Sequence, residues 1–122
     1  MHFWGALATL IVSDVDKAVQ FYTQKLGFEA NFENGNFVIV NGSQSKFLIE
    51  LASGQNSGNR NSPSIGIGVN SAEEAMQELK NKGVEFTSGI IEKPPYFKLA
   101  YFKDPDGNPF YVISGKFPFP PA

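Results

Sequence analysis

The sequence predicts an α+β fold built from two βαβββ modules. Short β-prone runs alternate with two segments of helical periodicity, and a Ser-, Asn- and Gly-rich stretch divides the 122 residues near the middle. The two halves also repeat the same order of elements. A chain of this length is expected to bury one sizeable core. We therefore predict a single domain over residues 1–122, with half-repeats at 4–51 and 63–114 joined by a linker at 52–62.

The first half begins with a strand that leads into a helix. Residues 7–12 are apolar and partly β-branched, and Ser13-Asp14 can cap a following helix. Apolar residues recur at helical spacing over 15–26, and Gly27 stands where a glycine commonly ends a helix. Three short β-prone runs separated by turn-forming residues then predict a meander. These runs lie at 28–32, 36–40 and 46–51.

The second half repeats this order. Residues 64–69 are strand-like, and Ser71 with Glu74 three residues later forms a capping box at which a helix is expected to begin. Gly83 is predicted to end that helix. Three more strands are predicted at 84–90, 97–102 and 109–114. The halves align at one constant offset through the first strand and helix, and the offset shortens by one residue after the helix.

Composition and charge argue against several classes of protein. The formal net charge is -2, and the ten Lys and Arg residues are scattered, whereas nucleic-acid binding needs clustered positive charge. No apolar run approaches the roughly 20 residues of a membrane-spanning helix, and no export signal is evident. We therefore predict a cytoplasmic protein that binds neither nucleic acid nor membrane. Cysteine is absent and His2 is the only histidine, which leaves no Ser-His-Asp triad and no thiolate site.

Three phrases lie in the order and spacing of a known superfamily. They are Val12-Ser13-Asp14, Phe21-Tyr22 leading to Leu26-Gly27-Phe28, and Asp104-Pro105-Asp106-Gly107-Asn108. Together with the duplication, they resemble the vicinal oxygen chelate superfamily, which includes glyoxalase I, extradiol dioxygenases, fosfomycin-modifying enzymes and bleomycin-resistance proteins. The resemblance covers about 7–114. It implies the glyoxalase/bleomycin-resistance/dioxygenase fold, in which the two modules form a cupped mixed sheet with the helices outside.

The resemblance also implies four metal-ligand positions in this fold. Here they correspond to Leu7, Glu50, Ser64 and Tyr111. Divalent transition metals in such sites are held by imidazole and carboxylate groups, for which leucine and tyrosine do not readily substitute. His2 could swing in, but it lies near a terminus. A lone carboxylate does not hold a catalytic ion, and we therefore expect no metal and no cofactor.

Strand alternation separates the residues that face the predicted cup from those that face the helices. On the first strand, Leu7 and Thr9 are predicted to face the cup. Ser64, Gly66 and Gly68 are predicted to face it on the corresponding strand of the second half. Small residues there leave space, either for a ligand or for large side chains from the opposite wall.

Glu50 is the candidate catalytic residue. It is predicted to point into the cup together with Leu48, where an ionised carboxylate needs a partner. Tyr101, Tyr111 and Arg60 are candidate partners. Three roles stay open for Glu50: a partly solvated residue without a function, a carboxylate that recognises a ligand, or a general base.

Four aromatic residues are predicted at strand ends or on the cup face, where a ring can stack on a planar ligand. They are Trp4, Tyr96, Tyr101 and Tyr111. The full predicted ligand-binding set comprises Trp4, Leu7, Thr9, Leu48, Glu50, Ser64, Gly66, Tyr96, Tyr101 and Tyr111.

Three functions are compatible with this sequence. The first is a metal-independent small-molecule-binding protein that resembles bleomycin-resistance proteins, with an unidentified ligand for which an aromatic compound is one expectation. The alternative is a divergent glyoxalase-like lyase or dioxygenase that uses Glu50. The third is an interaction module with an empty cup, because the fold alone does not decide function. The resemblance further implies a homodimer.

Overall fold

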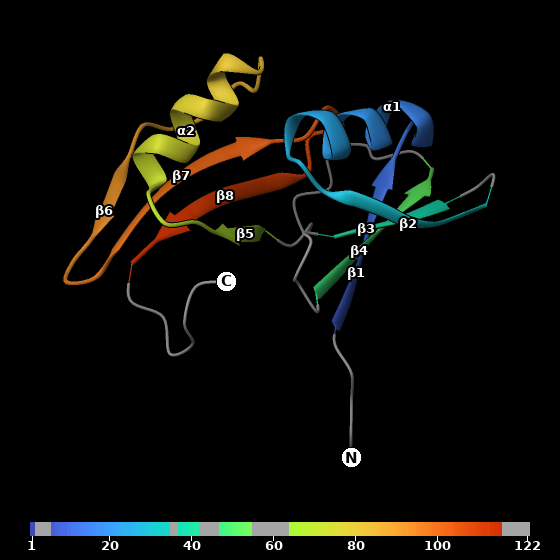
Figure 1. Cartoon of the computed structure of the whole chain (residues 1–122), viewed down its shortest axis with the longest axis horizontal. Helices are drawn as coiled ribbons and strands as arrows, with labels where there is room; N and C mark the ends of the chain where they lie inside the picture. Colours follow the sequence, from blue (N-terminus) through green and yellow to red (C-terminus); the bar gives the residue numbers. More distant parts are fainter. Residues whose placement is uncertain (2–5, 35–36, 42–46, 55–63, 116–122) are drawn as a thin grey trace. The chain divides into compact units, whose positions relative to one another are not determined.

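The chain folds as two compact units, Met1–Asn59 and Arg60–Ala122. The computed structural model describes residues 1, 6–34, 37–41, 47–54 and 64–115. Each unit holds one βαβββ module, and each module forms a four-stranded mixed sheet with its helix on one face (Figure 1). The predicted α+β class and the duplication are therefore confirmed. The prediction of one domain over residues 1–122 stays a prediction.

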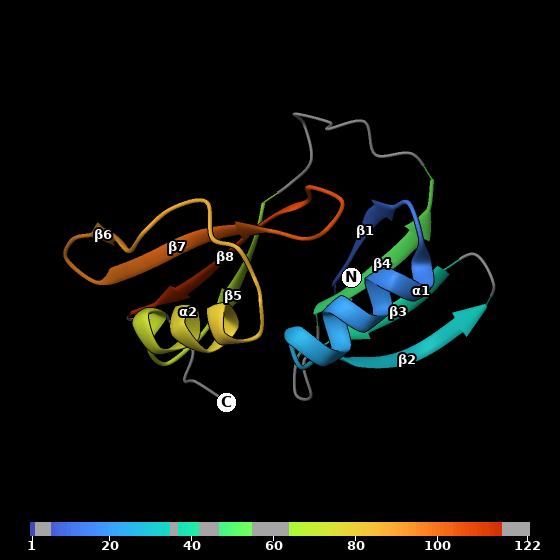
Figure 2. The same cartoon turned by 90° about the horizontal axis from the view of Figure 1, so that it is seen from above.

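The first unit contains the sheet β1-β4-β3-β2. β1 and β4 run parallel, and the other neighbours are antiparallel. The helical segment lies along one face of this sheet (Figure 2). The elements are β1 (Ala6–Val12), α1 (Val15–Gln20), the π-helix η1 (Phe21–Lys25), β2 (Glu29–Asn34), β3 (Phe37–Asn41) and β4 (Phe47–Ser53).

Local sequence explains where α1 begins and where the helical segment ends. The Asp14 side chain accepts a hydrogen bond from the backbone N–H of Lys17, as the cap prediction requires. Gly27 has a φ of 76°, which glycine adopts without steric cost. Between them, Tyr22 is fully buried and its ring stacks on Phe28. This contact packs the end of the helical segment against the residue that leads into β2.

The second unit contains the sheet β5-β8-β7-β6. β5 and β8 run parallel, and the remaining neighbours are antiparallel. The helix α2 lies across one face of this sheet (Figure 1). The elements are β5 (Ile65–Gly68), α2 (Ala72–Asn81), β6 (Ile91–Lys93), β7 (Phe97–Lys103) and β8 (Pro109–Ser114).

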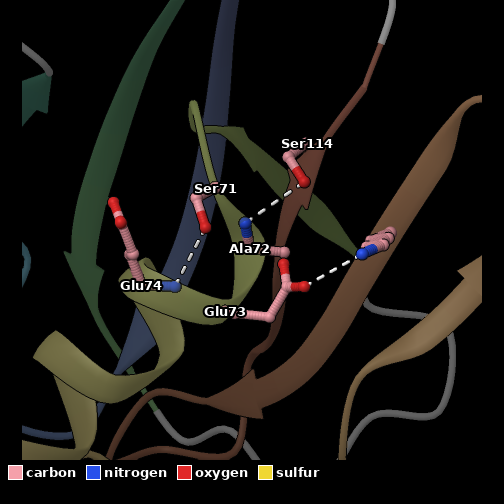
Figure 3. Close-up of polar contacts among 6 residues, drawn as sticks. Ser71, Ala72, Glu73, Glu74 and Ser114 are labelled. Carbon is pink, nitrogen blue, oxygen red and sulfur yellow. Dashed lines mark hydrogen bonds and ion pairs between the residues drawn. The ribbon is translucent and has the colours of Figure 1, made fainter.

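The first turn of α2 makes hydrogen bonds both within the helix start and to the sheet (Figure 3). The Ser71 hydroxyl accepts from the N–H of Glu74 at 3.1 Å, and the Ser114 hydroxyl on β8 accepts from the N–H of Ala72 at 3.1 Å. Lys98 on β7 donates to the Glu73 carboxylate at 3.0 Å. That hydrogen bond lowers the pKa of Glu73 and raises the pKa of Lys98. The helix start is therefore fixed to β7 and β8.

The predicted strand at 84–90 is wrong, because β6 forms only at Ile91–Lys93. The segment before β6 does follow β7, since the N–H of Thr87 donates to the Tyr101 carbonyl at 2.8 Å. The N–H of Tyr101, in contrast, donates to the side-chain hydroxyl of Ser88 at 2.9 Å. A side chain thus takes the place of a backbone carbonyl and interrupts the ladder.

Two further structural facts bear on the sequence predictions. β4 continues through Ala52 and Ser53, which the sequence assigned to the linker, and the rest of that segment from residue 55 lies outside the described residues. Within the described part of the chain, no helix is long and apolar enough to cross a membrane.

Candidate functional site

Each sheet has a helix-facing side and an opposite side, which we call its open face. On β1, Leu10 and Val12 are buried toward the helix, while Leu7 and Thr9 are exposed on the open face. The predicted separation of faces is therefore confirmed for this strand. Ligand contact by these residues stays a prediction.

Glu50 lies on the open face of the first sheet and is half-buried. In the parallel pair β1–β4, its register neighbour is Thr9, whose Oγ1 donates to Glu50 Oε1 at 2.7 Å. The hydroxyl partner found within the first unit is thus a threonine of the adjacent strand. The candidate partners Tyr101 and Tyr111 belong to the second unit and stay a prediction, and Arg60 lies outside the described residues. Sequence reasoning placed Thr9 on the correct face but did not identify it as the partner.

On the open face of the second sheet, the side chain of Tyr111 lies across Gly66. These residues are register neighbours in the parallel pair β5–β8. A Cβ atom at Gly66 would lie 2.7 Å from the Tyr111 hydroxyl oxygen and closer still to ring carbons. At Gly68, a Cβ atom would have no neighbour within 4 Å. The space at Gly66 is therefore filled from the adjacent strand, and the space at Gly68 is open.

Tyr101 and Tyr111 form a pair that we call the tyrosine platform. They are register partners on β7 and β8, with ring centroids 5.5 Å apart and planes tilted by 57°. Both side chains are half-buried. The platform is positioned by antiparallel pairing on one side and by the missing side chain of Gly66 on the other.

The structure does not bring every predicted aromatic residue to the platform. Tyr96 stands just before β7 and is 54% exposed, about 17 Å along the strand from Tyr101. Ser64 is exposed next to the start of β5. Trp4 and His2 lie outside the described residues.

The four family metal-ligand positions do not fit a divalent ion. Leu7 offers only hydrocarbon, and one oxygen of Glu50 is already engaged by Thr9. The Tyr111 side chain is laid over Gly66. Among the described residues there is no group of three or more His, Cys, Asp and Glu side chains that could hold a metal ion. With one carboxylate and no imidazole, this donor set supplies fewer ligands than such ions require.

The Asp104–Asn108 segment forms a turn in which the N–H of Gly107 donates to the Asp104 carbonyl at 3.0 Å. Asp104 is 5% exposed, and its Oδ1 accepts from the N–H groups of Asp106 and Asn108 at 2.9 and 2.8 Å. Its Oδ2 accepts from Asn108 Nδ2 at 2.8 Å. The carboxylate thus closes the connection between β7 and β8 through three hydrogen bonds.

Comparison with known proteins gives matches over most of the chain. The profile of the Glyoxalase/Bleomycin resistance protein/Dioxygenase superfamily matches residues 6–112. The uncharacterized protein YwkD of Bacillus subtilis (strain 168) is 32% identical over 113 residues, which cover 82% of this chain and 88% of YwkD.

Solved structures show the same arrangement of elements. A superfamily member from Sphaerobacter thermophilus DSM 20745 is 31% identical with a TM-score of 0.78, covering 93% of this chain and 98% of that one. The bleomycin-binding protein of Streptomyces verticillus, solved with copper(II)-bleomycin, is 22% identical with a TM-score of 0.75, covering 95% and 99%. The second likeness concerns the fold alone.

Proposed function

The chain belongs to the glyoxalase/bleomycin resistance protein/dioxygenase superfamily, and we propose that it is a metal-independent small-molecule-binding protein similar to bleomycin-resistance proteins. The proposal keeps two predictions of the sequence analysis, namely that the protein is cytoplasmic and that it acts as a homodimer. The ligand is a small molecule with an aromatic part.

The observation that carries the proposal is the tyrosine platform. Tyr111 occupies a position at which metal-dependent relatives are expected to have a ligand, and its ring lies beside Tyr101 and over Gly66. Paired aromatic rings on a half-buried surface favour stacking with a planar group, because they offer a large contact area at low entropic cost. Such a surface can hold a ligand without an ion. The bleomycin-binding protein of Streptomyces verticillus supports the same class of function.

The test is binding of bleomycin and of a panel of planar aromatic compounds, measured by calorimetry and by NMR. We expect Tyr111→Leu and Tyr101→Leu each to weaken binding of a responsive compound about two- to twelvefold, since an aromatic pair contributes about 0.5–1.5 kcal/mol. Tyr96→Leu is the matched control and should leave the affinity unchanged. Absence of binding across the panel, or equal losses in all three variants, would contradict the proposal.

The second candidate function is a divergent glyoxalase-like lyase or dioxygenase that uses Glu50. It is favoured by the geometry of that side chain: Thr9 holds Oε1 by a hydrogen bond, which orients the carboxylate on an open face. A carboxylate held in this way could act as a general base. Glu50→Gln should then abolish turnover in a lyase assay, and Asp16→Asn, which removes a carboxylate from the exposed side of α1, should not.

Metal content separates the two candidates. We expect less than one ion per chain after the purified protein is soaked with nickel, manganese, zinc or iron(II) and desalted, because the donor set is too small. Stoichiometric retention of a metal, measured by elemental analysis, would favour the enzyme.

A further inference from the structure

The Glu50 carboxylate forms no ion pair with Lys17 or Lys25, the described lysines of its own unit. Two ion pairs in the second unit join Glu78 with Lys82 and Glu73 with Lys98, and neither involves Glu50. Glu50 accepts one hydrogen bond, from Thr9. A carboxylate has room for about four hydrogen bonds, and most of that capacity is therefore left for a ligand.

The surroundings of this carboxylate are apolar and accessible. Leu7 and Ile11 precede and follow Thr9 on the same face of β1, and they are 49% and 37% exposed. Leu48, the register neighbour of Leu7, is half-buried next to them on β4. A charged acceptor is thus flanked by hydrocarbon, which strengthens its attraction for a donor that brings its own apolar group.

We propose that the open face of the first sheet binds the ammonium group of a small organic cation, with Glu50 as the anion and Leu7 and Ile11 in contact with its apolar body. The inference rests on the proposed small-molecule-binding function and adds the charge class of the ligand. An inorganic divalent ion does not suit the face, because one carboxylate and one hydroxyl supply too few ligands. An anionic ligand would be repelled by the carboxylate.

Three probes of nearly equal shape test the charge preference: benzylamine, benzyl alcohol and benzoate. Each is titrated into the full-length protein at neutral pH, and the backbone amide signals are followed by NMR. We expect benzylamine to bind about fivefold more tightly than benzyl alcohol, with shifts at Thr9 and Glu50, and benzoate to bind most weakly. The preference should shrink in about 1 M salt, which screens an accessible ion pair.

Two charge-neutralising variants complete the experiment. Glu50→Gln preserves the shape of the side chain and should remove the preference for the amine, while the control Asp16→Asn loses the same charge elsewhere in the unit and should keep it. Equal affinity of wild-type protein for amine and alcohol, or a preference that survives in Glu50→Gln, would overturn the inference. If aromatic compounds shift only Tyr101 and Tyr111, the proposed function stands and the inference fails. If no compound binds, both fail.

Discussion

The two units differ at an equivalent pair of positions on their open faces. In each unit the first and last strands run parallel, and the register brings Thr9 beside Glu50 in one unit and Gly66 beside Tyr111 in the other. The first pair is joined by a hydrogen bond, whereas in the second pair a ring covers a glycine. The same backbone geometry therefore holds a polar pair in one unit and an aromatic surface in the other.

The helix-facing sides have not diverged in this way. Ile49 precedes Glu50 and Phe110 precedes Tyr111, and both are buried at 3% and 0% exposure. A position that packs against a helix must be apolar or, like Ser114, hydrogen-bonded, because an unpaired buried polar group destabilises the fold. A position on the open face carries no such restriction. The contrast shows that the helix-facing side is kept largely apolar in both units, whereas the opposite side carries a different pair of residues in each.

The largest expected effect compares these two faces. Phe110→Ala should lower the free energy of unfolding by about 3–5 kcal/mol and Ile49→Ala by about 2–5 kcal/mol, because each leaves a cavity. Glu50→Ala should lower it by about 1 kcal/mol, the value of one hydrogen bond. Urea denaturation measures all three. A loss in Glu50→Ala as large as in Ile49→Ala would show that the open face also supports the fold.

A smaller effect is expected at the two glycines of β5. Gly66→Ala should lower the free energy of unfolding by about 1–3 kcal/mol, because its methyl group would overlap the Tyr111 ring. Gly68→Ala, which meets open space, should change it by less than about 0.5 kcal/mol. In the double variant Gly66→Ala/Tyr111→Ala the overlap is gone, and the loss should be less than additive. Additive losses would mean that the position of the Tyr111 ring does not depend on the missing side chain at Gly66.

The helix starts provide a third comparison. Ser71→Ala and Asp14→Ala should each lower the free energy of unfolding by about 1 kcal/mol, since each side chain caps one helix. Ser114→Ala should cost about 1–3 kcal/mol, because it leaves the buried N–H of Ala72 without its acceptor. Thermal unfolding of the three variants is the measurement. If Ser114→Ala does not change the stability, the hydrogen bond between Ser114 and Ala72 does not stabilise the packing of α2 on β8.

The smallest expected effect is the pH dependence of the exposed Glu73–Lys98 pair. The pKa of Glu73 is lowered in the folded protein. Its contribution to the free energy of unfolding is therefore present above the ordinary pKa of 4.5 and is lost as the pH falls through the lowered pKa. The pKa of Lys98 is raised in the folded protein. Its contribution to the free energy of unfolding is therefore present below the ordinary pKa of 10.5 and is lost as the pH rises through the raised pKa. Wild-type protein should melt slightly above Glu73→Gln near neutral pH, and the melting temperatures should converge in strong acid. A difference that persists in strong acid would contradict this assignment.

Much of the fold could be predicted because its signals are local. Asp14 and Ser71 cap their helices through residues three positions away, and Gly27 and Gly83 follow the helices with φ values of 76° and 89°. These interactions lie within one turn of chain and are legible in sequence. The sixth strand was misplaced because the hydroxyl of Ser88 interrupts its ladder with β7. No local pattern distinguishes that serine from an ordinary strand residue.

The candidate site was predictable only in part, for a related reason. The sequence by itself determined the α+β class, the duplication and the faces of β1, because periodicity is written along the chain, whereas the four metal-ligand positions were implied by the family resemblance. Only the tertiary structure decided that Thr9 binds Glu50 and that Tyr111 covers Gly66. Thr9 and Glu50 stand 41 positions apart, and their contact depends on the register between β1 and β4. Register arises from the packing of whole strands, which no single segment of sequence specifies.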